Sequence, residues 1–87
     1  QQYKAVESLS RGIPIVISSQ AADALMLKDK VNCLVANNVE EYFISIKTLM
    51  NSSEKYQEIA RNGLKYINKK FSWKSKVDKL VKYVYKI

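Results

Sequence analysis

ESLSRGIPIVIS, residues 7–18, is the stretch that decides the fold class of this 87-residue chain. Gly12 is typical of a left-handed helix stop, and Pro14 stands where a strand tolerates proline, at its first residue. Residues 15–17 are all apolar and β-branched, which favours a strand buried on both faces, as in a parallel sheet between helices. The stretch therefore predicts a helix, a tight turn and a buried parallel strand.

Hydrophobic spacing extends this pattern in both directions. Tyr3, Val6 and Leu9 recur at helical spacing and predict a helix before the turn. Residues 20–28 indicate a short helix after the strand, and residues 32–35 indicate a second short strand. Two strands that alternate with helices predict an α/β fold with a parallel sheet.

The remainder of the chain predicts three helices. Asn38 with Glu41 three residues on resembles a capping box, and it opens a helix over residues 39–50. Ser72 is expected to cap the last helix, over residues 73–87. The helix between them has one apolar face, formed by Tyr56, Ile59, Ala60, Gly63, Leu64 and Ile67.

Some of these residues are expected to face the core. Leu25 and Met26 are predicted to point inward from the 20–28 helix. Gly63 falls on an inward helix face, where a missing side chain lets a neighbouring element come close despite a cost of ~1 kcal/mol in helix propensity. Trp73 is interpreted as a packing anchor rather than a substrate contact.

A parallel pair of strands is not a complete sheet, because such strands need further neighbours. The helical pattern is also already under way at Gln1, with no capping residue before it. We therefore expect residues 1–87 to be the last part of a doubly wound domain whose earlier strands precede this sequence.

Composition excludes several classes of site. The chain has no histidine, so it cannot build a Ser-His-Asp triad or a histidine-ligated zinc site alone. Its one cysteine, Cys33, excludes an internal disulfide and fits a reducing compartment. No apolar run approaches the ~18–20 residues of a membrane span, so we expect a soluble, cytoplasmic protein.

The net charge of +7 comes entirely from the end of the chain. Residues 1–64 carry seven basic and seven acidic residues, whereas residues 65–87 carry eight lysines and only Asp78. A basic tail on a neutral body indicates one face that meets an anionic partner. A solvated lysine face on the last helices explains the pattern equally well.

Glu7 is the first candidate for binding chemistry. A carboxylate on this helix can accept two hydrogen bonds from a vicinal diol, as acidic residues do for ribose hydroxyls in nucleotide sites. The start of the helix, around residues 2–4, offers free backbone N–H groups to a phosphate. On composition alone, Glu7 is more simply an exposed glutamate in an early helical turn, favoured by the helix dipole.

Several short motifs in a fixed order along the chain are more informative than any one of these residues alone. Residues 7–18 resemble the signature E-A-x-A-x-G-x-P-V-[IV]-x-S. Residues 29–35 look like D-G-x-N-G-x-L-V with one position fewer, and residues 61–73 are similar to A-R-x-x-x-x-x-x-F-S-W with nine residues instead of six between Arg61 and Phe71. These elements occur in the same order in retaining glycosyltransferases of the GT-B fold, above all family four. The resemblance covers essentially the whole chain.

The resemblance implies a partial Rossmann-like domain, the C-terminal half that holds a nucleotide sugar, with a short parallel sheet and a helix-rich C-terminal half. It implies that Glu7 binds the nucleotide ribose, as the second glutamate of a Glu-x7-Glu motif, and that the backbone at Tyr3 and Lys4 lies near the diphosphate. The first glutamate of that motif would precede Gln1. The helix over 73–87 would cross back toward an N-terminal domain of the same protein.

The resemblance further implies an enzyme that transfers a sugar, with retention, from a nucleotide-sugar donor to a glycan or lipid-linked acceptor in polysaccharide biosynthesis. It implies no metal, no cofactor apart from the donor substrate, and no catalytic residue within these 87 residues, so the isolated piece is expected to be inactive. The lysine tail would then meet an anionic membrane at its inner face.

A rival interpretation is a small basic binding module that uses its lysine-rich C-terminal helices on nucleic acid or an anionic membrane. In the nucleic-acid form of this hypothesis, the lysines contact phosphates and Tyr66, Phe71, Tyr83 or Tyr85 stack on bases. The chain contains no recognised nucleic-acid motif, so nucleic acid is the less favoured partner.

The sequence departs from the family pattern at several glycines. Gln2 stands where the pattern has the glycine that lets backbone approach the diphosphate, and Ala21 and Ala22 stand in place of a Gly-Gly pair. Lys30 and Cys33 replace two further glycines before the second strand. Lost glycines remove positive-φ freedom and close backbone approach, so the sugar pocket is expected to differ from the family's.

Overall fold

The structure, a computed structural model, describes the backbone of residues 2–86 and the side chains of residues 4–70 and 72. Within that range the elements are α1 (Gln2–Ser10), β1 (Val16–Ile17), α2 (Ser19–Leu25), β2 (Leu34–Val35), α3 (Val39–Asn51) and α4 (Ser53–Lys86). The chain is a small α/β fold, rich in helix, with a short two-stranded parallel sheet. This confirms the α/β class predicted from the sequence.

The sheet is parallel, as predicted, but its strands are very short. Val16 pairs with Leu34 and Ile17 pairs with Val35. Ile15 is buried, whereas Val16 and Ile17 are only half-buried, so the expected burial of all three residues on both faces is wrong. The physical reason is that a two-stranded sheet has no further strands beside it to exclude water.

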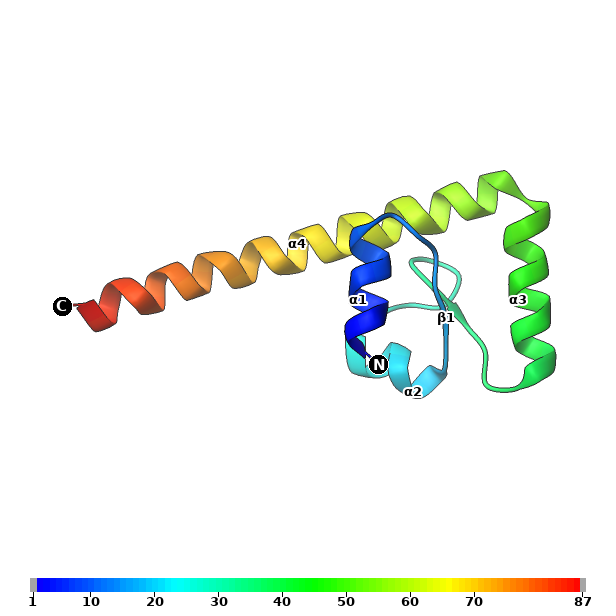
Figure 1. Ribbon diagram of the computed structural model, residues 1–87, viewed down its shortest axis with the longest axis horizontal. Coiled ribbons are helices and arrows are strands. Elements are labelled where there is room, and N and C mark those ends of the chain that lie inside the picture. The colour runs from blue at the N-terminus through cyan, green and yellow to red at the C-terminus, as the bar shows by residue number, and fades with distance from the viewer. Residues whose placement is uncertain (1, 87) are drawn as a thin grey trace.

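The elements form layers around this sheet (Figure 1). In the view of Figure 1, α1 lies on one side of β1, α3 lies on the other, and α4 crosses the end of the body where α1 finishes. The first residues of α1 and α3 lie at the opposite end, beside α2. The carboxyl ends of both strands point to that same end, because each strand runs away from α4.

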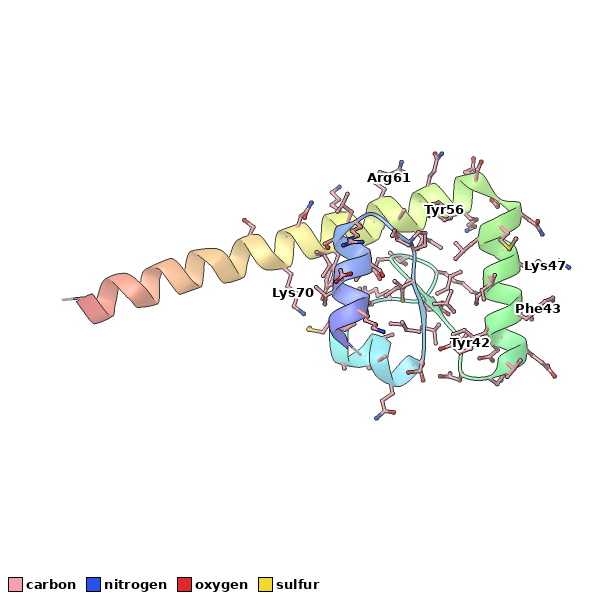
Figure 2. All side chains as sticks on the ribbon, in the orientation of Figure 1. Tyr42, Phe43, Lys47, Tyr56, Arg61 and Lys70 are labelled. Carbon is pink, nitrogen blue, oxygen red and sulfur yellow. The ribbon has the colours of Figure 1, made fainter. Side chains whose placement is uncertain are left out.

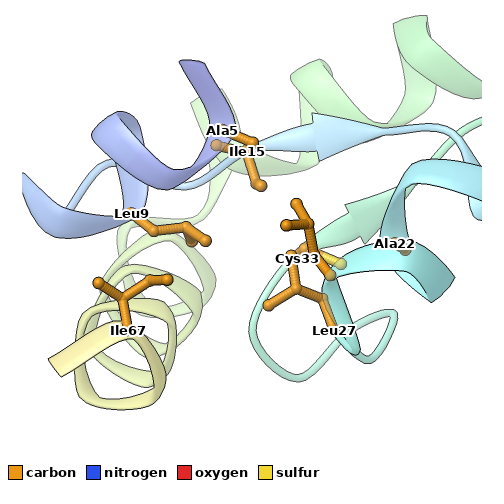
Figure 3. Packing of buried hydrophobic residues seen from close by; sticks show 8 residues of the cluster. Ala5, Leu9, Ile15, Ala22, Leu27, Cys33 and Ile67 are labelled. Carbon is orange, nitrogen blue, oxygen red and sulfur yellow. The ribbon is translucent and has the colours of Figure 1, made fainter. Parts of the chain in front are cut away.

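One hydrophobic cluster joins the helices to the sheet (Figure 3). Its buried members are Ala5, Leu9, Ile15, Ala22, Leu25, Leu27, Cys33 and Ile67. Leu9 from α1 and Ile67 from α4 approach each other in this cluster, at 2% and 3% exposure. The core is therefore closed by the fourth helix and not by a second sheet layer.

The prediction that Met26 points inward is wrong. Helix α2 ends at Leu25, and Met26 takes the left-handed conformation with φ 58°, donating its N–H to the carbonyls of Ala22 and Asp23. Its side chain is 73% exposed, and the next residue, Leu27, is buried in its place. The helix thus ends about one turn earlier than the predicted helix over residues 20–28.

The predicted helix break at Ser72 is also wrong, and the last two predicted helices are one. Helix α4 runs without interruption from Ser53 to Lys86. Residues 68–73 hold neither glycine nor proline, and continuing a helix through one serine costs less than nucleating a new helix. In the part of the chain that the structure describes, no helix combines the length and apolar character needed to cross a membrane. The side chain of Trp73 lies outside the described residues.

Gly63 is confirmed as a point of close approach. A Cβ atom there would lie 2.6 Å from Cδ2 of Leu9 and 3.3 Å from the carbonyl oxygen of Asn32. Beside it, the Asn62 side-chain amide donates a 2.9 Å hydrogen bond to the carbonyl oxygen of Val31. Helix α4 therefore sits directly against α1 and the turn that precedes β2.

We expect Gly63→Ala to destabilise the chain by about 1–2 kcal/mol. Overpacking typically lowers the free energy of unfolding by ~1–3 kcal/mol, and the higher helix propensity of alanine offsets up to ~1 kcal/mol of this loss. Urea unfolding followed by circular dichroism measures the change. Lys65→Ala, at an exposed position of the same helix, is the control. A Gly63→Ala variant as stable as this control would contradict the close contact.

Candidate functional site

The candidate site lies at the end of the sheet where both strands finish. Ser18 follows β1 and caps α2, its Oγ accepting a 3.2 Å hydrogen bond from the Ala21 N–H. Asn38 follows β2 and caps α3, its Oδ1 accepting from the Glu41 N–H at 2.9 Å. The predicted cap at Asn38 is confirmed. In a standard capping box the Glu41 side chain would accept from the backbone N–H of Asn38, the capping residue. Here Glu41 Oε1 accepts from the N–H of Asn37 instead.

Asn37 connects the two loops at this edge. Its Oδ1 accepts hydrogen bonds from the backbone N–H of Ser19 at 2.9 Å and from the Ser19 hydroxyl at 3.1 Å. The loop after β2 is therefore fixed to the first residue of α2. Sequence reasoning missed this role, and the only local signal was an asparagine pair directly after a strand.

A cavity of about 510 Å³ opens at the same edge. Its lining comes from four elements and consists of Ala5, Ile17, Ser18, Gln20, Ala21, Ala24, Leu25 and Tyr42. Ala21 and Ala22, which replace the glycine pair of the family pattern, play different parts here. Ala21 lines the cavity, whereas Ala22 is buried in the core.

Glu7 does not line this cavity. Ala5 and Leu9 face the core, and Glu7 lies two residues from each, on the opposite, exposed side of α1. Glu7 Oε1 lies 3.7 Å from Nη2 of Arg11, with both side chains more than three-fifths exposed. An exposed pair of this kind contributes little to stability, so the carboxylate is accessible to other partners.

The other two predicted site residues belong to the first turn of α1. Lys4 is exposed, and the side chain of Tyr3 lies outside the described residues. The structure thus puts the first residues of α1 at the carboxyl edge of the sheet and Glu7 about 4.5 Å further along the helix axis than Lys4.

Lys30 has left-handed backbone geometry, with φ 66°. A tight turn imposes it, since the Lys30 N–H donates to the carbonyl of Cys33 at 2.8 Å and Asp29 Oδ1 accepts from the Val35 N–H at 2.8 Å. The glycosyltransferase pattern that the sequence resembles has glycine at positions 12 and 30, and Gly12 likewise has left-handed geometry, with φ 73°. Lysine pays a conformational penalty at such a position that glycine avoids.

Lys30→Gly is expected to stabilise the chain by about 1 kcal/mol, because it removes the left-handed strain without removing a described hydrogen bond. Thermal unfolding measures the change as a rise in Tm. Lys28→Gly, an equally exposed position two residues earlier, is the matched control and should destabilise. If both variants lost stability to the same extent, the strain at Lys30 would be refuted.

Cys33 is a packing residue. Burial, with a smaller contribution from the negative charge of Asp29, raises the pKa of its thiol from 9.0 to about 11. The thiol is therefore protonated at neutral pH, and the thiolate needed for nucleophilic attack or metal binding is scarce. The small buried strand residue inferred from the sequence matches this environment, since its side chain is fully buried.

This raised pKa predicts a pH dependence. The unfolded thiol ionises near pH 9 and the folded thiol near pH 11, so the unfolded state binds fewer protons between these values. The stability that Cys33 contributes is fully present below pH 9 and falls by up to about 2–3 kcal/mol as the pH rises to 11. Urea unfolding of the wild type and of Cys33→Ala across this window measures it. Parallel curves for the two proteins would contradict the burial of the thiol.

A second cavity, of about 500 Å³, lies between α3, β2 and α4. Leu34, Ile44 and Ile59 form part of its apolar lining, and Lys30 and Lys55 contribute the positive charges. The two carboxylates in its lining, Asp29 and Glu41, already accept backbone hydrogen bonds.

Comparison of the chain with protein-family models, with curated proteins and with solved structures found no match.

Proposed function

We propose that this chain forms the nucleotide-binding part of a retaining glycosyltransferase with a Rossmann-like, GT-B fold. One observation carries the proposal. The exposed carboxylate of Glu7 stands on α1, whose first residues lie at the carboxyl edge of the parallel strands. A carboxylate there can accept hydrogen bonds from a ribose diol, with the backbone at Tyr3 and Lys4 near the diphosphate.

The topology supports this site. In open α/β sheets, ligands bind in the crevice outside the carboxyl ends of the strands. Here the carboxyl ends of β1 and β2, the start of α1 and the cavity beside Ser18 lie at one edge. The hydrogen bonds of Asn37 hold the two loops of this edge together before any ligand arrives.

Two backbone conformations agree with the resemblance. Gly12 and Lys30 both occupy positions at which the family pattern has glycine, and both have positive φ. Ala21, Ala22 and Cys33, at further glycine positions of the pattern, do not. A tight turn that needs positive φ favours glycine, because glycine adopts this conformation without strain. Lysine has replaced glycine at position 30 while the conformation that favours glycine is retained.

In this proposal the residues of the chain bind and orient the donor. Glu7 exchanges its 3.7 Å contact with Arg11 for hydrogen bonds from the ribose hydroxyls. The backbone at Tyr3 and Lys4 lies near the diphosphate. The acceptor is a glycan or a lipid-linked sugar, and its binding site and the opposite wall of the cleft would come from other parts of the protein.

The rival proposal, a basic nucleic-acid module, loses one of its aromatic residues. The Tyr66 hydroxyl donates a 2.7 Å hydrogen bond to the carbonyl of Leu25, and its ring packs against the core with the Lys70 amine 5.8 Å from the ring centroid. The ring is therefore engaged within the fold. The side chains of Phe71, Tyr83 and Tyr85 lie outside the described residues. An anionic membrane stays a proposed partner for the lysine-rich end of α4.

The test is a titration of the isotope-labelled chain with ADP, GDP and UDP, followed by the backbone amide signals in NMR spectra. We expect shifts in α1 and in the loop after β1. Glu7→Gln should weaken binding about 10–100-fold, since a hydrogen bond to a charged group contributes ~1.5–3 kcal/mol. Glu54→Gln, on α4 away from this edge, is the matched control and should bind normally.

The ribose assignment has its own measurement. The 2′,3′-dideoxy analogue of the bound nucleotide lacks both hydroxyls, so the wild type should bind it more weakly than the parent nucleotide. Glu7→Gln should show no such preference. An equal preference in both proteins would remove Glu7 from the ribose site, and shifts with single-stranded DNA but with no nucleotide would replace the proposal with the basic module.

A further inference from the structure

The outer face of α3 is apolar and exposed. Val39, Phe43, Ile46 and Met50 form this outer stripe, and they are 84%, 68%, 48% and 79% exposed. Helix α3 has no buried residue, although Ser45 and Thr48 are half-buried on its inner side. In Figure 2, Phe43 and Lys47 point away from the sheet, whereas Tyr42 points toward it. The helix therefore shows its most apolar side to solvent.

The spacing of the outer stripe is that of a coiled-coil seam. Its residues are separated by four, three and four positions, which corresponds to heptad positions d, a, d and a. Such a stripe fits another helix lying along it. A small ligand would not need this length or spacing.

Charges on one flank of the outer stripe specify the partner and its direction. Glu40 and Lys47 each follow a d residue, so both occupy e positions, seven residues apart on the same flank. Neither forms an ion pair with any side chain that the structure describes. The corresponding g positions are Tyr42 and Leu49, which carry no charge.

We propose that α3 packs antiparallel against α3 of a second copy of this chain, related by a two-fold axis. In an antiparallel pair the e flanks of the two helices face each other. Glu40 then meets Lys47 of the second copy, and the two-fold axis repeats this pair. In a parallel pair each e residue would face an uncharged g residue, and no ion pair would form.

The same alignment pairs the apolar residues. Phe43 packs against Ile46 of the second copy near the two-fold axis, and Val39 packs against Met50 at each end. With only two heptads in the seam, the dimer is weak, so it forms at high micromolar concentration or above. Tyr42, on the g flank of the outer stripe, points toward the sheet and the cavity that it lines, so dimerisation leaves the candidate nucleotide site open.

Sedimentation equilibrium of the full chain at 0.15 M salt, over about 10 μM to 1 mM, is the test. We expect a monomer–dimer equilibrium. Glu40→Lys and Lys47→Glu should each raise the Kd about tenfold, equivalent to about 1.4 kcal/mol, since each creates two like-charge contacts. The double reversal restores both opposite-charge pairs and should bring the Kd back to within about twofold of wild type.

Two further variants distinguish association through the outer stripe from a general effect of changing the charge or the stability of the chain. Phe43→Ser should abolish the dimer while leaving the helical circular dichroism spectrum unchanged, because the side chain makes no core contact. Lys65→Glu, the same charge change on an exposed part of α4, should leave the Kd unchanged. A monomer at 1 mM would overturn the proposal. A dimer whose Kd did not change with any α3 variant would overturn it too, and would place the association on another surface of the chain.

Discussion

The packing of α4 against α1 at Gly63 is the contact on which the rest of the structure depends. A two-stranded sheet cannot enclose a core, so the apolar residues of α1 and of the turn before β2 need a cover from elsewhere. Helix α4 supplies it because Gly63 has no side chain to hold it away from Leu9 and Asn32. Ile59 and Ile67, one helical turn to either side of Gly63, are then both buried.

This contact also determines how the candidate site is presented. Once Ala5 and Leu9 are fixed against the core, helix geometry leaves Glu7 on the outside of α1. The direction of β1 then puts the start of α1 at the carboxyl edge of the sheet, with the Asn37 hydrogen bonds holding the loops beside it. The site follows from packing at the far end of α1, and Ala5 and Leu25 belong both to the cavity lining and to the core cluster.

The sequence predicted those features that depend on backbone chemistry or on clear periodicity. Gly12 has the expected positive φ, Gly63 allows the expected close approach, and Asn38 caps the expected helix. The errors arose where competing structures differ by little free energy. Serine is common both at caps and inside helices, so Ser72 gave no reliable break.

Other features depend on contacts between distant residues, which periodicity does not report. The exposed turn at Met26 was set by Leu27 entering the core. The bond from Asn37 to Ser19 joins loops that follow different strands. Positive φ at Lys30 contradicts the preference of lysine and was foreseeable only from the glycine in the family pattern. The role proposed for Glu7 comes from the family pattern, because an exposed glutamate on a helix gives no local signal of ribose binding.

The continuity of α4 has a mechanical consequence. From Gly63 to Lys86 the helix extends 23 residues, or about 35 Å at 1.5 Å per residue. Because α4 is unbroken, a small rotation of the helix about its contact with α1 becomes a large displacement at its far end. A tilt of about 10° at Gly63 moves the far end by about 6 Å, from the same helix geometry. A force applied to the lysine-rich end would therefore be delivered to the helix that carries Glu7.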